Sequence, residues 1–302
     1  MTAGNRRIGD TRLEPREDPR IRVALHAAIL GERGPILDER HLTVVSLQGR
    51  ERVSSPFEFQ LELHGNDELD DGLHVRFDDV VGRPVTAAID LPASEWDASL
   101  YTAASVERFS RLLHGQAGDE SLSVFNGIAT SFSMSQPGVY HLTMRPAIWK
   151  TTLTNRYQLY SGQSIRDVIA SILDRHGIDC DLSRISAPDN PANAHVQDWL
   201  QAGETDHEVM QRLMQKAHLY YYFVHEATTH TVVFANDEHY PAIFDDPDRA
   251  LHYTHTSEQG LDRADHVQHY TYARNLTATG VRTHFVRRHE AWECGAVHPW
   301  TS

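Results

Sequence analysis

The sequence of 302 residues contains only two cysteines, Cys180 and Cys294, which lie in unrelated surroundings. Two isolated cysteines supply neither a disulfide framework nor a thiolate metal site, and their scarcity is typical of a reducing compartment. Basic residues are also few, 28 against 42 acidic residues, which gives a formal net charge of -14. Because nucleic-acid binding depends largely on lysine and arginine that displace counterions, this charge argues against a nucleic-acid partner.

Hydrophobic residues form no run long enough to cross a membrane. The longest early run, IRVALHAAIL at residues 21–30, is about half as long as a membrane-spanning helix requires. It also lies too far from the start, and behind too many acidic residues, to be a convincing signal peptide. We therefore expect no membrane span, and no ordinary secretion signal if the protein leaves the cell.

The sequence lacks the short motifs that identify common active sites. It has no GxxxxGK[ST] or GxGxxG phosphate loop and no GxSxG nucleophile motif. Its 20 histidines suggest a metal site, but no close pair flanks a glutamate at the spacing of a zinc-binding helix. We expect surface or polar-face histidines, and we predict no catalytic, cofactor-binding or metal-binding residues. The closest pairs are His225 and His230, His252 and His255, His266 and His269, and His284 and His289.

Strand patterns dominate the first half of the chain. In FEFQLEL, at residues 57–63, bulky apolar residues alternate with polar ones, which is typical of a half-buried strand. FNGIATSFSM at 125–134 and VYHLTMRP at 139–146 predict a hairpin that turns at SQPG. Five or more strands without intervening helices favour an antiparallel sheet or barrel, with a possible short helix near VERFSRLL at 106–113.

Two amphipathic helices follow. Ser164 and Asp167 predict a capped helix over residues 164–176, which Gly177 ends. Thr205 and Glu208 predict the cap of the second helix, which leads into the aromatic strand LYYYFVHE. LYYYFVHE and HTVVFAND then predict a second hairpin around ATTH.

Glu204 and Asp206 raise the question of a general acid/base pair. Both lie at the positive end of the second helix, where the helix dipole favours acidic residues. We favour this capping role, because no nucleophile or histidine dyad accompanies the pair in the sequence. Likewise, the aromatic run from Tyr220 to Phe223 lacks the basic residues that would accompany stacking on bases, so packing is the preferred interpretation.

Several of these stretches, in this order, resemble the VgrG family, the spike-tip proteins of type VI secretion systems, and the related baseplate hubs of contractile phage tails. The similar segments are VSLQGRERVSSPFEFQLEL at 45–63, FNGIATSF at 125–132, VYHLTMRPAIW at 139–149, SIRDVIASIL at 164–173 and the stretch from 203 to 226. The most recognisable pattern comprises Gln197, Glu204, Thr205, Asp206, Arg212, Leu213, Tyr221, Tyr222 and Phe223.

The resemblance implies a fold and a set of partners. It implies an α+β, mainly β fold, in which an antiparallel β-barrel tube domain precedes an α+β domain and part of a second barrel. It also implies a homotrimer that docks on the Hcp-type inner tube and contacts baseplate proteins. A PAAR-type tip or effector is expected only if a C-terminal spike is supplied elsewhere. Such a protein is cytoplasmic during assembly, is exported through the secretion apparatus and is not an enzyme.

The expected domains follow the same comparison. Residues 1–39 form a partly disordered N-terminal extension, 40–150 the first barrel, 151–245 the α+β domain, and 246–302 an incomplete second barrel with an atypical tail. The chain ends before the OB-like domain and β-helix spike of the family, so we expect a truncated, frameshifted or split gene product. Two further departures are a long link at 93–122 and His218–Leu219 in place of a glycine before the aromatic strand.

Three other functions remain open from the sequence. A phage tail baseplate hub is the nearest alternative. A metal-dependent hydrolase that uses the histidine-rich second half is the alternative from another class. A carbohydrate- or peptide-binding module is the third, and it would use an exposed groove lined by some of the five tryptophans: Trp96, Trp149, Trp199, Trp292 and Trp300.

Overall fold

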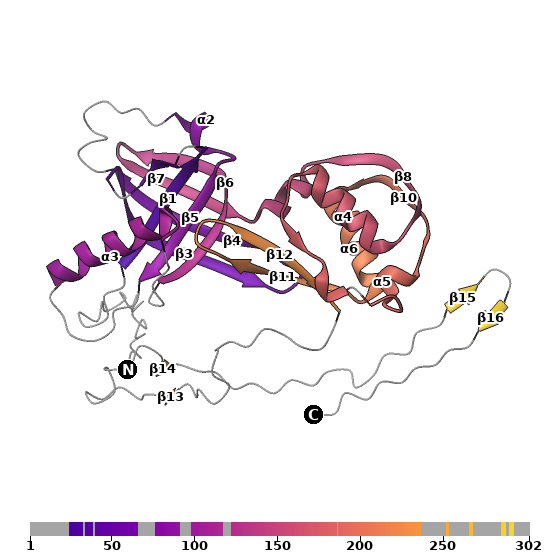
Figure 1. The fold of residues 1–302 in the computed structure, drawn as a ribbon. Helices are drawn as coiled ribbons and strands as arrows, with labels where there is room; N and C mark the ends of the chain where they lie inside the picture. Colours follow the sequence, from indigo (N-terminus) through magenta and orange to yellow (C-terminus); the bar gives the residue numbers. More distant parts are fainter. Residues whose placement is uncertain are drawn as a thin grey trace, which may run out of the picture. The chain divides into compact units, whose positions relative to one another are not determined.

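The computed structural model describes residues 24–32, 34–38, 40–65, 76–90, 98–116, 122–185 and 187–236, together with four short strands between residues 252 and 292 (Figure 1). Its contacts divide the chain into two units, Met1–Asp245 and Asp246–Ser302. Nearly all of the described residues belong to the first unit. Within the described residues, no helix combines the length and apolar character that crossing a membrane requires.

A seven-stranded antiparallel sheet forms the first part of the larger unit. Neighbouring strands follow the order β2-β1-β5-β6-β7-β4-β3, with β2 and β3 at its two edges. The mainly β fold with an α+β part is therefore confirmed, whereas the described strands form an open sheet and not the closed barrel that we expected. The strands are β1 (Ala24–Gly31), β2 (Gly34–Leu37), β3 (Leu42–Arg52), β4 (Ser55–Gly65), β5 (Pro84–Asp90), β6 (Leu122–Gln136) and β7 (Val139–Arg145).

Alternation in β4 determines which face of the sheet carries the core. Phe57, Phe59, Leu61 and Leu63 are all buried, while the residues between them are half-buried or exposed. The predicted hairpin at 125–146 is confirmed by β6 and β7, which pair antiparallel around Pro137 and Gly138. One face of the sheet is thus apolar and packed, as period-two patterning requires.

The strand β1 lies within the segment that we predicted as an N-terminal extension. It pairs with both β2 and β5, and it is therefore an interior strand of the sheet. Ala27 and Ile29 join the main core, while Ala28 joins a second apolar cluster with Phe109 of the helix α3 (Ala98–Leu113). Because β1 is buried on both faces, it lacks the alternation that identifies a half-buried strand.

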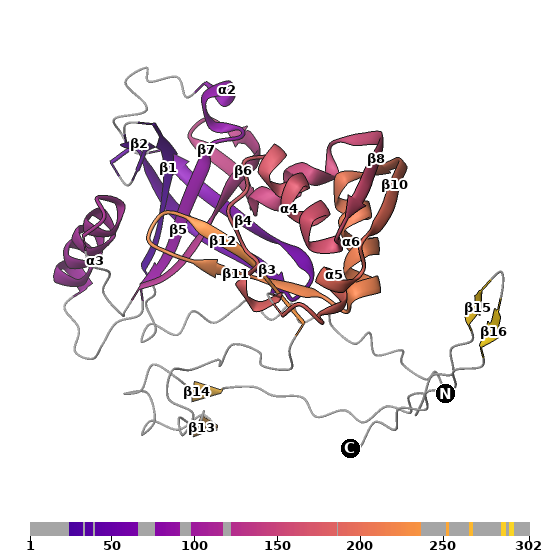
Figure 2. The ribbon, with the colours of Figure 1, turned by 45° about the vertical axis from the view of Figure 1, so that its right-hand side comes forward.

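The helix α3 covers the face of β1 and β5 opposite the main core (Figures 1 and 2). It is longer than the short helix that we predicted here. A buried polar cluster fixes it: the Ser105 hydroxyl donates to Asp90 at 2.5 Å, and His26 Nε2 lies 2.6 Å from Ser105 Oγ. Arg108 also pairs with Asp90. The long link that departs from the family pattern therefore includes a packed layer.

The α+β part follows the sheet. Two strands, β8 (Asn155–Gln163) and β10 (Gln197–Thr205), form an antiparallel ribbon, and a three-stranded sheet has the order β11-β12-β9. The hairpin β11–β12 confirms the second predicted hairpin. The remaining elements of the larger unit are α2 (Phe77–Val80), η1 (Ala147–Thr152), α4 (Ile165–Arg175), β9 (Cys180–Asp181), η2 (Ser183–Ile185), α5 (Pro191–Ala194), α6 (Asp206–Ala217), β11 (Tyr220–His225) and β12 (His230–Ala235).

Both predicted helix caps are confirmed. Ser164 and Asp167 form a capping box at the start of α4, and Thr205 and Glu208 form another at the start of α6. Each box satisfies backbone N–H groups that the first helical turn leaves unpaired. The apolar faces of both helices are buried in the same core as the sheet.

The smaller unit contains only short strands in its described part. β13 (His252–Tyr253) and β14 (His266–Val267) pair in parallel, and β15 (Phe285–Arg287) and β16 (Glu290–Trp292) pair antiparallel. The rest of the segment predicted as an incomplete second barrel, residues 246–302, lies outside the described residues.

Candidate assembly surfaces

Glu204 and Asp206 have different partners and do not form an acid/base pair. Glu204, near the end of β10, makes a bidentate ion pair with Arg212 of α6. Asp206 is fully buried at the first position of α6, where the guanidinium of Arg156 donates to both of its oxygens at 3.0 Å. The predicted capping role thus describes Thr205 and Glu208, while Asp206 organises a buried cluster.

A histidine does accompany Asp206, contrary to the sequence interpretation. His176 Nε2, just after α4, lies 2.8 Å from Asp206 Oδ2, and the Gln201 amide donates to Oδ1 at 2.9 Å. Burial raises the pKa of Asp206, but the hydrogen bonds of Gln201 and His176 and the charge of Arg156 outweigh it and hold this pKa below its ordinary value. A carboxylate held ionised in this way ties α6 to the ribbon and to α4, and it is poorly suited to donate a proton.

His225 and His230 are buried more deeply than the predicted surface histidines. They lie opposite each other in the β11–β12 hairpin, and both rings contact the ring of Phe57 in β4. The backbone N–H of Asn126 donates to His225 Nδ1 at 3.0 Å, and that of Ala147 donates to His230 Nε2 at 2.9 Å. The pair therefore joins the hairpin to the sheet.

Asn126 completes this junction. Its side-chain amide donates to the carbonyl oxygens of Glu226 and Thr229, which flank the hairpin turn. Its side-chain oxygen accepts the hydroxyl proton of Thr86 on the neighbouring strand. One buried amide thus uses both donors and its acceptor to hold the α+β part on the sheet.

The aromatic strand and the described tryptophans do not form a binding site for bases, sugars or peptides. Tyr221 and Phe223 are buried. The ring of Tyr222 is not free to stack on a ligand, because Arg184 lies over it and donates a hydrogen bond to its hydroxyl. Trp199 is buried on the inner face of the ribbon, and Trp149 lies against Arg145, so neither lines an open groove.

Further histidines and tryptophans lie largely beyond the described side chains. Among the described residues, no group of three or more His, Cys, Asp or Glu side chains is placed to hold a metal ion. The side chains that the structure does not describe are those of His252, His255, His266, His269, His284, His289, Trp96, Trp292 and Trp300.

The β8–β10 ribbon has one buried face and one exposed apolar face. Tyr160 and Trp199 pack inward, whereas Tyr157, Leu159 and Leu200 are 84%, 57% and 59% exposed. Leu159 lies directly opposite Leu200, and Tyr157 directly opposite Ala202. Single exposed apolar residues are ordinary, but adjacent ones on neighbouring strands indicate an interaction surface.

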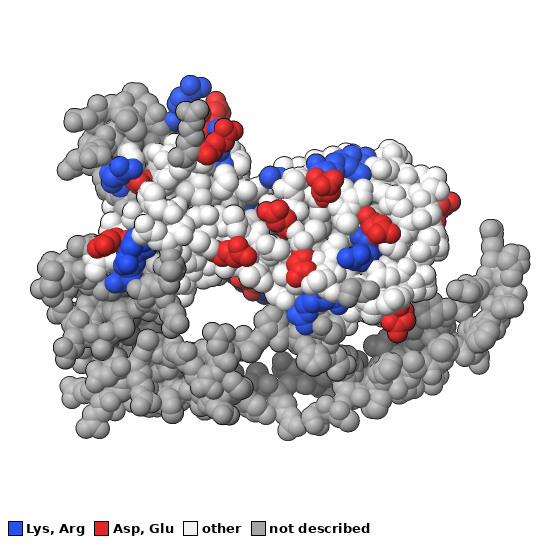
Figure 3. All heavy atoms as spheres, in the orientation of Figure 1, with Lys and Arg blue, Asp and Glu red and all other residues white. Residues whose placement is uncertain are grey.

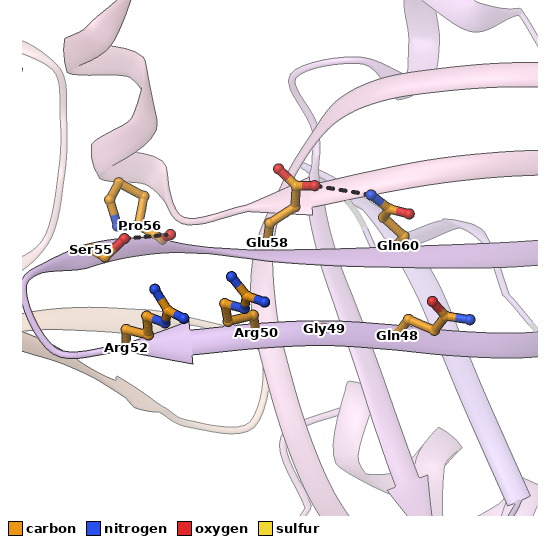
Figure 4. Close-up of a pocket in the computed structure, with 8 residues that line it drawn as sticks. All are labelled: Gln48, Gly49, Arg50, Arg52, Ser55, Pro56, Glu58 and Gln60. Atoms are coloured by element: carbon orange, nitrogen blue, oxygen red, sulfur yellow. Dashed lines mark hydrogen bonds between the residues drawn. The ribbon is translucent and has the colours of Figure 1, made fainter. Parts of the chain in front are cut away.

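A hollow of about 490 Å³ lies along the edge of the sheet, between β3 and β4 (Figure 4). Arg50 and Arg52 extend from β3 beside Glu58 and Gln60 of β4. Glu58 is already paired with Arg145, and neither Arg50 nor Arg52 forms an ion pair with another described residue. The remaining lining residues are Gln48, Gly49, Ser55 and Pro56.

The two surfaces differ in charge. The outward positions of the ribbon are mostly uncharged, with the exposed Asp198 on β10, while the hollow presents two arginines at a sheet edge. On the face drawn in Figure 3, described charges of both signs are interspersed and form no block of one sign. The two arginines of the hollow, which form no ion pair with another described residue, are therefore a local feature of the β3 edge.

Comparison with known proteins identifies a family. The family model described as phage tail baseplate hub (GPD) matches residues 50–291. The type VI secretion system spike protein VgrG1b of Pseudomonas aeruginosa is 23% identical over 267 residues, which are 83% of this chain and 31% of that protein. VgrG1c of the same organism is 24% identical over 198 residues, or 65% of this chain and 23% of that protein. The chain thus spans about a third or less of these curated relatives.

Two solved structures are also similar to parts of this chain. The E. coli c3393 protein, described as a type VI secretion component, is 16% identical, with a TM-score of 0.44 over 70% of this chain and 49% of that one. The PdpA–VgrG complex in its lidless form is 9% identical, with a TM-score of 0.45 over 72% of this chain and 36% of that one.

Proposed function

Because the chain belongs to the phage tail baseplate hub family, we propose that it is a structural hub of a contractile injection machine that acts by assembly and not by catalysis. The family match over residues 50–291 carries this proposal, since it takes in most of the sheet and all of the described α+β part. The structural roles of Asp206, His225 and His230 support it, because these groups are committed to internal contacts.

The curated relatives favour a type VI secretion system as the machine. In this proposal three copies form a ring that docks on an Hcp-type inner tube and lies within the baseplate. The parts of the hub are the sheet that includes β1 and β2 and extends to residue 150, then residues 151–245 and 246–302. The protein leaves the cell through the apparatus. Contacts with a PAAR-type tip or an effector belong to this proposal only where a C-terminal spike is supplied elsewhere.

A phage tail hub is the second candidate, because the matching family is described as a phage tail component. The two machines place the same kind of protein between a tube and a baseplate, so the hub geometry does not distinguish them. Neighbouring genes do: a sheath protein with a ClpV-like ATPase indicates secretion, whereas capsid and terminase genes indicate a phage.

The hub proposal is tested by native mass spectrometry and co-sedimentation. We expect the purified chain to form trimers and to sediment with preassembled Hcp-type tubes. A folded chain that stays monomeric at high concentration and ignores the tubes would contradict the proposal. Stoichiometric zinc or iron retained through dialysis would instead favour a metal-dependent hydrolase.

A further inference from the structure

We propose that the exposed face of the β8–β10 ribbon of one copy binds the β3–β4 hollow of a second copy, with the exposed face of the Tyr157 ring against Arg50 and Arg52. This inference rests on the proposed self-assembly, and it assigns the two surfaces that assembly uses. The two surfaces differ in chemical character. The ribbon exposes apolar side chains, whereas the hollow is a recess that contains two arginines without an ion-pair partner among the described residues.

The ribbon face is large enough to be an interface component. Tyr157, Leu159 and Leu200 lie on neighbouring positions of its two strands. Together they expose on the order of 400 Å² of mostly apolar surface, within the range of the largest patches on monomers. A standard interface takes about 800 Å² from each partner, so this patch supplies about half of one side.

Tyr157 is the side chain most suited to act as an anchor. Its hydroxyl lies over Gly203, where an added Cβ would be 2.9 Å away, so the ring lies across the ribbon while remaining 84% exposed. Tyrosine and arginine are the residues that most often dominate the energy of an interface, because each combines a large flat contact area with a polar group. An exposed ring held in this way loses little conformational freedom on binding.

The hollow contains positively charged groups that can stack on the Tyr157 ring. Arg50 and Arg52 have no ion-pair partner among the described residues, and guanidinium groups stack favourably on aromatic faces. The same arginines complement the exposed carboxylate of Asp198 on the ribbon. β3 is also an edge strand, so its unpaired backbone groups favour a protein partner over bulk solvent.

The two surfaces differ, which determines the kind of assembly. A contact between a surface and a different surface of the next copy is heterologous, and it closes into a ring when the rotation allows. A ring of three copies requires this kind of contact, whereas a surface that binds itself gives a dimer. The ribbon and the hollow therefore suit the proposed ring.

Paired variants test the inference. The ribbon variant carries Tyr157→Asp and Leu159→Asp, the hollow variant carries Arg50→Glu and Arg52→Glu, and a control carries Val224→Asp on β11, which is 42% exposed and belongs to neither surface. We expect native mass spectrometry to show both variants as monomers and the control as wild-type oligomers. An equimolar mixture of the two variants should form heterodimers, because one intact ribbon can still meet one intact hollow.

Several outcomes would overturn the inference while leaving the hub proposal intact. If the wild-type protein and both variants all form the same oligomers, the assembly uses other surfaces. Monomeric variants whose mixture stays monomeric show that the ribbon does not meet the hollow. Far-UV circular dichroism and thermal unfolding establish that each variant is folded, and the single substitutions Tyr157→Ser and Arg52→Gln, which should weaken assembly at least tenfold, replace any variant that is not. A wild-type chain that never assembles defeats the hub proposal itself.

Discussion

Phe59 occupies the space that a side chain at Gly49 would need. The two residues are opposite each other in the β3–β4 ladder, and a Cβ added to Gly49 would lie 1.9 Å from Phe59 Cδ1. The ring also packs on Phe125 of β6, with ring centroids 4.7 Å apart. The glycine is therefore required by packing and not by its backbone angles, and an aromatic ring that covers a strand glycine protects a weak point of the sheet.

We expect Gly49→Ala to destabilise the protein by about 2 kcal/mol, because a buried ring must move to admit the methyl group. In a Phe59→Leu background the same substitution should cost roughly 1 kcal/mol less, since the smaller side chain leaves room. Urea unfolding of the four proteins in this double-mutant cycle measures the coupling. Strictly additive free energies would show that the ring and the glycine do not compete for space.

We expect the protein to lose stability in mild acid because of the buried His230. Its burial, followed by the charges of His225 and Lys150, lowers its pKa from 6.5 to about 4, against the opposing effect of Glu51. The folded protein thus binds this proton less readily than the unfolded chain does. The stabilisation is complete above pH 6.5 and is lost as the pH falls toward 4, amounting to about 3 kcal/mol. Protonation also removes the acceptor of the Ala147 N–H group.

The substitution His230→Gln isolates this contribution. Glutamine can still accept the hydrogen bond from Ala147, but it does not titrate between pH 6.5 and 4. The variant should therefore be less stable at pH 7 and show a flatter stability profile below pH 6.5, measured by urea unfolding at several pH values. His64→Gln is the matched control, since His64 is an exposed residue of β4. Parallel profiles for wild type and His230→Gln would refute the assignment.

Removing the buried charge of Asp206 should strongly lower the stability of the protein. The Asp206 carboxylate binds Arg156, His176 and Gln201 and lies 3.6 Å from Arg175. Asp206→Asn keeps the shape but leaves Arg156 and Arg175 without their anion, which should cost about 3 kcal/mol. Thermal and urea unfolding measure the loss.

A surface carboxylate gives the control for this experiment. Glu62→Gln removes a charge of the same sign from the outer face of β4, where it lies near the exposed His64. Such pairs contribute little, so we expect a change of less than about 1 kcal/mol. If Asp206→Asn is tolerated equally well, the cluster around Asp206 does not stabilise the fold.

Local signals were enough to predict some elements but not the clusters between them. The alternation of FEFQLEL and the Ser164–Asp167 spacing depend on residues that are close in sequence, so they could be interpreted directly. Asp206 gathers partners from β8, α4 and β10, and nothing in the spacing of these elements indicates that they meet.

The candidate surfaces were missed for a related reason. Tyr157 and Leu200 look like ordinary core residues in the sequence, and only the register of β8 with β10 places them together on an exposed face. The strand β1 escaped prediction because burial on both faces removes its periodicity. Pairing between distant segments, and not composition, determined these features.

The end of α6 gives the last prediction. His218 follows the helix with φ of 53°, a left-handed conformation that costs an L-residue about 1–2 kcal/mol and that glycine adopts freely. His218→Gly should therefore stabilise the protein by roughly 0.5–1 kcal/mol, after the greater freedom of glycine in the unfolded chain is subtracted. His218→Ala keeps the strained backbone and should give no gain. Urea unfolding decides between them: equal effects of the two substitutions would mean that the exposed imidazole, and not the backbone, determines the stability of this turn.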